Sequence, residues 1–235
     1  MYFDWTYLVL VLPFVLLSMW ASSNVNNTFQ KYAKQYSSRG ITGAQAAQRV
    51  LMMHGVRGVS ITQVSGNLTD HFDPKSNVIR LSEGVYNSTS TAAIGVACHE
   101  AGHAVQYSVG YFPMKIRAMI IPVTNFGSKL AMPLILAGVL LSAFGYYLYD
   151  LVYIGIACFS LSLVFQLVTL PVEFNASRRA VEAIEQSNIL SYAEMTGAKK
   201  TLRAAALTYV AAAAVSLAQL LRLILLFGRG RRRRD

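Results

Sequence analysis

The sequence predicts a mainly α-helical integral membrane protein, with four transmembrane helices and a small α+β domain. Hydrophobic residues make up 54% of the 235 residues and charged residues only 14%, whereas a soluble domain carries about 25% charged residues. The deficit of charged residues is concentrated in four long apolar runs. Each run is close to the length of about 20 residues that crosses a bilayer core. Residues 22–127 are the longest stretch without such a run, and we expect them to form the soluble part.

The four predicted spans are residues 5–21, 130–148, 151–170 and 204–227. The first could also be a signal peptide, but it lacks the positive n-region of such peptides. We therefore interpret residues 1–21 as a retained anchor. Only Tyr149 and Asp150 separate the second run from the third, so residues 130–170 should form a tight helical hairpin. Residues 204–227 should then be a separate transmembrane helix.

Helix and strand signals are mixed within residues 22–127. Thr42 can cap an amphipathic helix, and residues 59–64 and 77–82 alternate as short strands do. Residues 70–74 are interpreted as a polar corner between the two strands. This part of the chain should therefore contain a helix, a small sheet and a further helix.

That further helix carries the most informative motif, His99-Glu100-Ala-Gly-His103. Residues 86–90 offer several N-cap side chains and residues 91–97 contain no proline, which favours a helix. Both histidine rings then leave one face, one turn apart, and can share a metal ion. In the H-E-x-x-H pattern two histidines bind zinc and the glutamate is the general base of a metalloprotease. Two core histidines bonded to backbone carbonyls are the alternative, but a buried glutamate without a partner would be costly.

Residues 171–203 are predicted to form a third-ligand helix and a connector, with Pro171 at the first helical position. One narrow helical face consists of Glu173, Ala176, Ser177 and Ala180. Small residues let this face approach another helix closely, and Glu173 could then be the third ligand. Catalytic zinc has three protein ligands and one open position. An ion pair between Glu173 and Arg178 or Arg179 is the alternative, but two crossings return Glu173 to the side of the motif.

With these motifs the chain resembles the YugP-type neutral zinc metallopeptidases, bacterial membrane proteins more distantly similar to the HtpX and CAAX-processing (Ste24) peptidases. The matching segments are residues 68–74, 81–86 and 99–106 and the segment around Glu173. The resemblance covers nearly the whole chain and implies a zincin-like, gluzincin-like metallopeptidase domain. It also implies zinc at His99, His103 and Glu173, with Glu100 catalytic.

Two positions depart from the pattern of these relatives. Asn175 stands where we expect Asp, and Ser177 stands where the wider HtpX-like group carries Asp. The partner that orients His99 or His103 therefore stays open. The donor to the oxyanion is also open, and the candidates by chemistry alone are His71, Tyr192, Arg178 and Arg179.

The expected function is that of a membrane-embedded, zinc-dependent endopeptidase acting on a peptide or membrane-protein substrate. Glu100 would be the general base on a zinc-bound water and would pass the proton to the leaving amine. The alternative is a non-catalytic membrane scaffold or interaction protein in which zinc holds the hairpin to the soluble part. A structural site has no use for Glu100, which favours the enzyme. The sequence indicates neither the natural substrate nor the oligomeric state.

The chain has a formal net charge of +10, and residues 228–235 form a basic tail. A basic tail after an apolar helix is typical of a membrane-flanking anchor. No interleaved aromatic residues or nucleic-acid module accompany it, so we expect the lipid bilayer as a partner and no nucleic acid.

Positive charges also indicate the orientation in the membrane. Four spans put both termini on one side and both site segments on the other. Lys31 and Lys34 follow the first span and no Lys or Arg precedes it, and positive flanks mark the cytoplasmic side. We therefore expect a multi-pass protein of the cell membrane with its active site on the cytoplasmic face, although the arginines of the tail favour the reverse.

Labelling of single cysteines in intact cells tests this orientation. In a chain without its two native cysteines, an impermeant thiol reagent should label Asp235→Cys and miss Lys75→Cys, because only the termini should be outside. Labelling of position 75 alone would place the site on the outer face.

Overall fold

A computed structural model describes residues 5–144 and 148–228 of the chain. Contacts divide the chain into two compact units. The helical unit comprises Met1–Trp20, Ile116–Leu170 and Tyr209–Asp235, and the site unit comprises Ala21–Lys115 and Pro171–Thr208. The predicted basic tail lies outside the described residues, except for Gly228.

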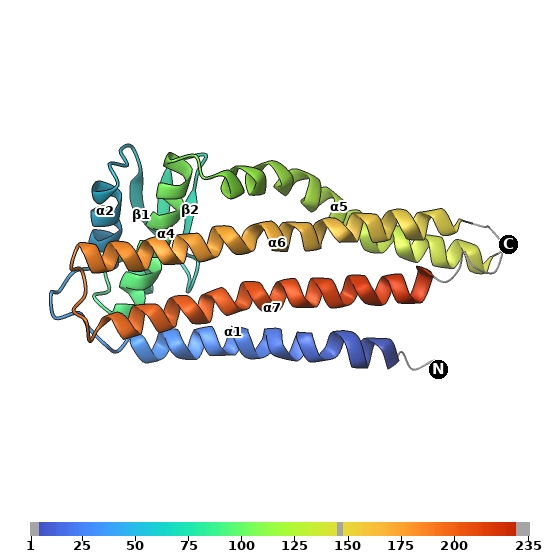
Figure 1. The fold of residues 1–235 in the computed structure, drawn as a ribbon, viewed down its shortest axis with the longest axis horizontal. Helices are drawn as coiled ribbons and strands as arrows, with labels where there is room; N and C mark the ends of the chain where they lie inside the picture. The colour runs from blue at the N-terminus through green and yellow to red at the C-terminus, as the bar shows by residue number, and fades with distance from the viewer. Residues whose placement is uncertain (1–4, 145–147, 229–235) are drawn as a thin grey trace. The chain divides into compact units, whose positions relative to one another are not determined.

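Among the described residues, four helices are long and apolar enough to cross a membrane, which confirms the predicted number of spans. They are α1 (Leu12–Tyr32, preceded by the π-helical turn η1, Tyr7–Val11), α5 (Phe112–Ala143), α6 (Tyr149–Gln186) and α7 (Met195–Phe227), as Figure 1 shows. Within the helical unit, α5 and α6 pack closely through glycines. A Cβ atom at Gly155 would lie 2.8 Å from the carbonyl oxygen of Ala131, and one at Gly138 would lie 2.9 Å from the amide nitrogen of Val152. Such small residues allow helix backbones to approach each other in membranes.

Two helix boundaries differ from the expectation. The helix α5 begins at Phe112, well before residue 127, where the sequence interpretation ended the soluble part. The expectation that a separate helix starts at Pro171 is wrong, because α6 continues through this proline. Proline removes one hydrogen bond of the helix ladder, but long apolar helices tolerate it where other groups satisfy the freed carbonyl. The segment that carries Glu173 is therefore a direct continuation of an apolar helix.

The site unit contains a three-stranded sheet of β1 (Ser60–Val64), β2 (His71–Asp73) and β3 (Val78–Ser82), in the order β1-β3-β2. Strand β1 is parallel to β3 and β2 is antiparallel to it. Two of these strands were predicted, but the interpretation of residues 70–74 as a polar corner missed β2. Three residues are too few to show a periodicity, and β2 exists because its backbone pairs with β3, where His71 lies opposite Arg80.

The helix α4 (Thr91–Ser108) carries the motif and is buried on most sides. Its N-cap is Ser90, whose side chain accepts a hydrogen bond from the amide of Ala93, as predicted for this segment. The predicted helix after Thr42 is α2 (Gly43–Met53), and its capping box is complete. The short helix α3 (Glu83–Tyr86) connects β3 to the segment before α4.

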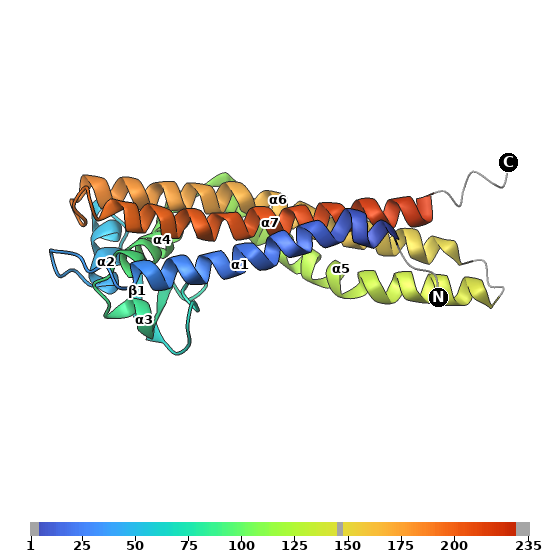
Figure 2. The same cartoon turned by 90° about the horizontal axis from the view of Figure 1, so that it is seen from below.

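A single core surrounds α4 within the site unit. Side chains of α2, β3, α6 and α7 pack in the same cluster as Ile94 and Val105 of α4, and Figure 2 shows α4 beside α2 and α6. On the side of α6 the contact is between backbones, since a Cβ atom at Gly102 would lie 2.8 Å from the carbonyl oxygen of Ala176. Ala176 and Ala180 are fully buried. The predicted face of small residues thus packs directly on the motif helix.

Candidate metal centre

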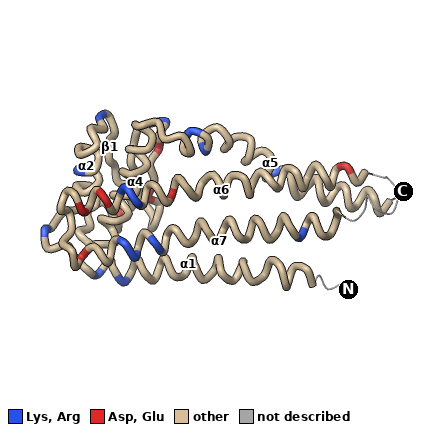
Figure 3. Tube along the Cα trace, viewed as in Figure 1, with Lys and Arg blue, Asp and Glu red and all other residues tan. Residues whose placement is uncertain are grey.

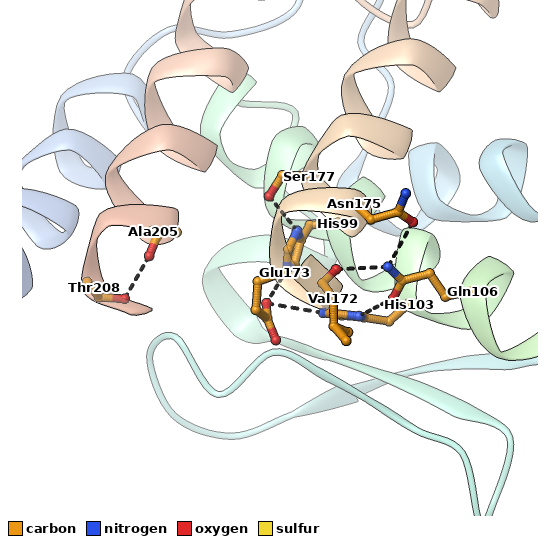
Figure 4. A network of polar contacts seen from close by, with 9 residues as sticks. All are labelled: His99, His103, Gln106, Val172, Glu173, Asn175, Ser177, Ala205 and Thr208. Atoms are coloured by element: carbon orange, nitrogen blue, oxygen red, sulfur yellow. Dashed lines mark hydrogen bonds and ion pairs between the residues drawn. The ribbon is translucent and has the colours of Figure 1, made fainter. Parts of the chain in front are cut away.

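The close contact of α4 and α6 brings two histidines and a glutamate together (Figure 4). The rings of His99 and His103 lie 4.7 Å apart between centroids, as expected for neighbours one helical turn apart. Oε2 of Glu173 lies 3.2 Å from Nε2 of His99 and 3.4 Å from Nε2 of His103. The structure therefore brings together the three residues that the sequence indicates as ligands.

The donor set of this cluster fits zinc. Two imidazole nitrogens and one carboxylate oxygen lie within 4.8 Å of one another, and these are the ligand types of zinc sites with two histidines and a glutamate. In the described part of the chain, no fourth His, Cys, Asp or Glu atom joins the group. Three protein ligands with one open position are the arrangement of catalytic zinc, whereas structural sites have four.

A hydrogen-bond chain behind His103 fixes which ring nitrogen carries the proton. Nε2 of the fully buried Gln106 donates to the carbonyl oxygen of Val172 at 2.8 Å and to Oδ1 of Asn175 at 3.0 Å. Because a carbonyl only accepts, Oε1 of Gln106 must face His103, where it lies 3.0 Å from Nδ1. Nδ1 of His103 is therefore the donor, and the other nitrogen, Nε2, faces Glu173. A proton or a metal ion must lie between Nε2 and the carboxylate, since two lone pairs would repel each other.

The hydrogen-bond chain behind His103 ends at the charged side chain of Arg179. The other histidine, His99, has a single hydroxyl as its partner. Nε of Arg179 donates to Oδ1 of Asn175 at 2.8 Å. The hydroxyl of Ser177 lies 3.1 Å from Nδ1 of His99 and can accept its hydrogen, which leaves Nε2 of His99 directed at Glu173. Of the two positions that depart from the relatives' pattern, Ser177 contacts His99 directly, and Asn175 contacts Gln106, the partner of His103. Such partners orient the rings of metal-binding histidines.

Gln106 lies at the end of the matching segment 99–106, where the sequence indicated no role for it. It lies three residues after His103, and therefore on the same side of α4. A glutamine in a mostly apolar motif helix was the available signal in the sequence, but its partners Val172 and Asn175 are more than 60 positions away in the chain. Only the packing of α6 on α4 shows that Gln106 connects His103 to α6 by hydrogen bonds.

Acidic groups dominate the electrostatics around the cluster. Burial lowers the pKa of His103, but its hydrogen bond with Glu173 and the charges of Glu100 and Glu173 raise it, and the net direction is upward. Burial also raises the pKa of Asp70, hydrogen bonds from Ser82 oppose this, and the charge of Glu100 adds to the increase. Glu100 itself is 8% exposed. In the described residues, no hydrogen bond or ion pair occupies its carboxylate.

The structure does not connect the other candidate side chains with the cluster. His71 is exposed on β2, and its Nδ1 lies 2.8 Å from the carbonyl oxygen of Thr69. Arg178 is exposed and forms an ion pair with Glu182 at 3.8 Å. Tyr192 is 95% exposed. A role of these three side chains in oxyanion binding stays a prediction.

The described residues contain four helices that could cross a membrane and a largely buried His-His-Glu cluster, which together define a multi-pass membrane protein with the ligand set of a zinc peptidase. The family model described as "Putative neutral zinc metallopeptidase" matches residues 7–228, and the chain belongs to this family. The chain is 47% identical over 215 residues to the "Putative membrane protease YugP" of Bacillus subtilis (strain 168), which covers 92% of this chain and 93% of that relative. No solved structure matches the chain. These findings confirm the family resemblance of the sequence motifs and zinc as the cofactor.

The first prediction from this site concerns metal content. The purified wild type should carry about one zinc ion per chain, and Glu173→Ala should lose most of it because one of three ligands is gone. Metal analysis measures this, with Glu182→Ala as the control, since Glu182 is an exposed carboxylate on the same helix. If Glu173→Ala binds as much zinc as Glu182→Ala, Glu173 is not a ligand.

The second prediction concerns the partner of His103. Gln106→Leu keeps the volume but leaves Nδ1 of His103 without its acceptor, so zinc affinity should fall by about 10- to 100-fold. Competition with a chelator measures the affinity, and Gln48→Leu, at an exposed position of α2, is the control. An affinity equal to that of the control would show that Gln106 does not orient the ligand.

Proposed function

We propose that the protein is a membrane-embedded, zinc-dependent endopeptidase. The observation that carries this proposal is the combination of a three-ligand cluster with a buried carboxylate, Glu100, that has no hydrogen-bond or ion-pair partner in the described part of the chain. A structural metal site would need a fourth ligand and no base. Hydrolysis needs both an open metal position and a proton acceptor.

Each residue then has a distinct task. Zinc, when bound by His99, His103 and Glu173, supplies a Lewis acid that acidifies water and polarises a carbonyl group. Glu100 accepts the proton of the attacking water and passes it to the nitrogen of the leaving amine. Glu100 is 8% exposed, and no hydrogen bond or ion pair in the described part of the chain occupies its carboxylate. Ser177 and Gln106 hold the two histidine rings in the orientation that presents Nε2.

We expect a peptide substrate to bind at the edge of the sheet that β2 forms. Strand β2 is at one edge of the sheet, and the ring of its Phe72 lies 5.9 Å from that of Tyr107 on α4. An extended peptide can add to such an edge as a further strand, with main-chain hydrogen bonds supplying the affinity. The relative YugP carries the name of a membrane protease, and we extend that activity to this chain.

A zinc-stabilised membrane scaffold is the alternative from a different class. It explains the cluster and the helices but not Glu100, a buried charge without a partner that a scaffold has no reason to keep. The two functions differ in one measurable respect, since only the peptidase depends on the proton acceptor.

Glu100→Gln tests the proposal, because glutamine keeps the shape of the side chain and cannot accept the proton. The variant should bind zinc as the wild type does and should lose at least about 100-fold in hydrolysis. The assay detects new amino termini by mass spectrometry in a peptide mixture prepared from a proteome. Glu83→Gln, at an exposed position of α3, is the control and should keep full activity.

Two results would contradict the proposal. Glu100→Gln with the activity of the wild type would show that Glu100 is not the base. A wild type that holds zinc and cleaves no peptide in the mixture would favour the scaffold.

A further inference from the structure

The site unit contains an open groove between α1 and α7, separate from the metal centre, with a volume of about 330 Å³. Its lining residues are Asn24, Thr28, Lys31, Tyr32, Lys200, Arg203, Ala204 and Leu207. None of them belongs to the metal cluster or to the hydrogen-bond chain behind it.

Each helix contributes one continuous stripe to this groove. The four residues of α7 are spaced i, i+3, i+4 and i+7, and those of α1 fall at i, i+4, i+7 and i+8. Residues at these spacings share one face of a helix. The two helices therefore face each other along these stripes over about two turns each, and the groove is a feature of the helix pair rather than of one loop.

Three positive charges line the groove, and among the described residues their one partner within the groove is the ring of Tyr32, 5.6 Å from Nζ of Lys31. In the described part of the chain, no carboxylate lies within ion-pair distance of Lys31, Lys200 or Arg203. The neighbouring Lys199 differs, because its ammonium group contacts Glu185 at 2.6 Å. Three cations around one hollow repel one another, and an anion in the hollow would remove this repulsion.

The order of residues along α7 indicates an amphipathic anion. Lys200 and Arg203 come first, and Ala204 and Leu207 follow at the start of the apolar part of the helix. Figure 3 shows that charged residues become sparse along the rest of α7. Cations that lie immediately before a membrane span are placed at the level of lipid headgroups. A small soluble anion would make no use of the apolar pair.

We propose that this groove binds the phosphate headgroup of an anionic phospholipid. Arg203 can donate two parallel hydrogen bonds to a phosphate, and Lys31 and Lys200 add point charges. Thr28 and Asn24 offer further donors for the oxygens of the glycerol and phosphate groups. Leu207 supplies apolar surface for the first carbons of an acyl chain. This inference does not depend on peptidase activity.

Native mass spectrometry of the full-length protein released from detergent micelles tests the proposal. Retention of phosphatidylglycerol and of phosphatidylcholine with the same acyl chains is compared between three proteins. These are the wild type, the groove variant Lys31→Gln/Lys200→Gln/Arg203→Gln, and the control variant Arg49→Gln/Arg57→Gln/Lys75→Gln, which loses the same charge at exposed positions outside the groove. A second arm adds inorganic phosphate in excess, since a soluble phosphate offers the same charge.

The wild type and the control variant should retain one phosphatidylglycerol at least about tenfold better than phosphatidylcholine, and the groove variant should lose this preference. Inorganic phosphate should not displace the lipid. Equal retention of phosphatidylglycerol by the groove and control variants would overturn the proposal, as would equal retention of the two lipids. Displacement by phosphate alone would make the ligand a soluble anion and would also overturn it.

A milder pair of variants covers the case in which the groove variant does not fold, as judged from its zinc content and melting temperature. Lys200→Gln removes a charge that lines the groove, whereas Lys199→Gln removes the adjacent charge that contacts Glu185. Lys200→Gln should lower the retention of phosphatidylglycerol by several-fold more than Lys199→Gln. Equal effects of the two would overturn the proposal.

Discussion

The burial of one carboxylate determines most of the architecture around the site. Glu173 is 2% exposed, and a carboxylate that deep is stable only with charged or hydrogen-bonding partners around it. Two of its partners, His99 and His103, come from α4, and α6 approaches α4 until their backbones touch. Gly102 and Ala176 make this possible, because any Cβ atom at position 102 would lie 2.8 Å from the carbonyl oxygen of Ala176. The small residues of both helices are therefore part of the metal site, although none of them offers a ligand.

The continuity of α6 adds a second constraint. Glu173 follows Leu170, the last residue of the helical unit on this helix, by three positions, which is about 4.5 Å along a helix axis. The same segment supplies Val172, Asn175 and Ser177 to the hydrogen bonds behind both histidines. Fewer than two turns of helix after an apolar run thus carry the candidate ligand Glu173, the partner of His99 and two partners of Gln106. A substitution in this segment would act on the whole site.

Local patterns in the sequence predicted those parts of the structure that depend on interactions between residues close together in the chain. The four apolar runs, the capping of α2 and α4, the strands β1 and β3, and the helical motif all follow from spacing and side-chain type within about 20 residues. The approach of Glu173 was also predictable, because small residues at a helical spacing leave few alternatives. Strand β2 and the role of Gln106 were not, since both depend on partners that only the folded chain brings near. The start of a helix at Pro171 was predicted wrongly, because proline is as compatible with the interior of a long apolar helix as with a first turn.

The hydrogen bonds behind the two histidines lead to a metal without any use of the motif. Ser177 and Gln106 lie at Nδ1 of His99 and His103, which leaves Nε2 of each ring directed at Glu173. Two ring lone pairs and a carboxylate oxygen that converge on one point repel one another unless a cation lies among them. A divalent cation accepts all three ligand atoms at once, whereas protonated histidines would give up the lone pairs that Ser177 and Gln106 are placed to expose.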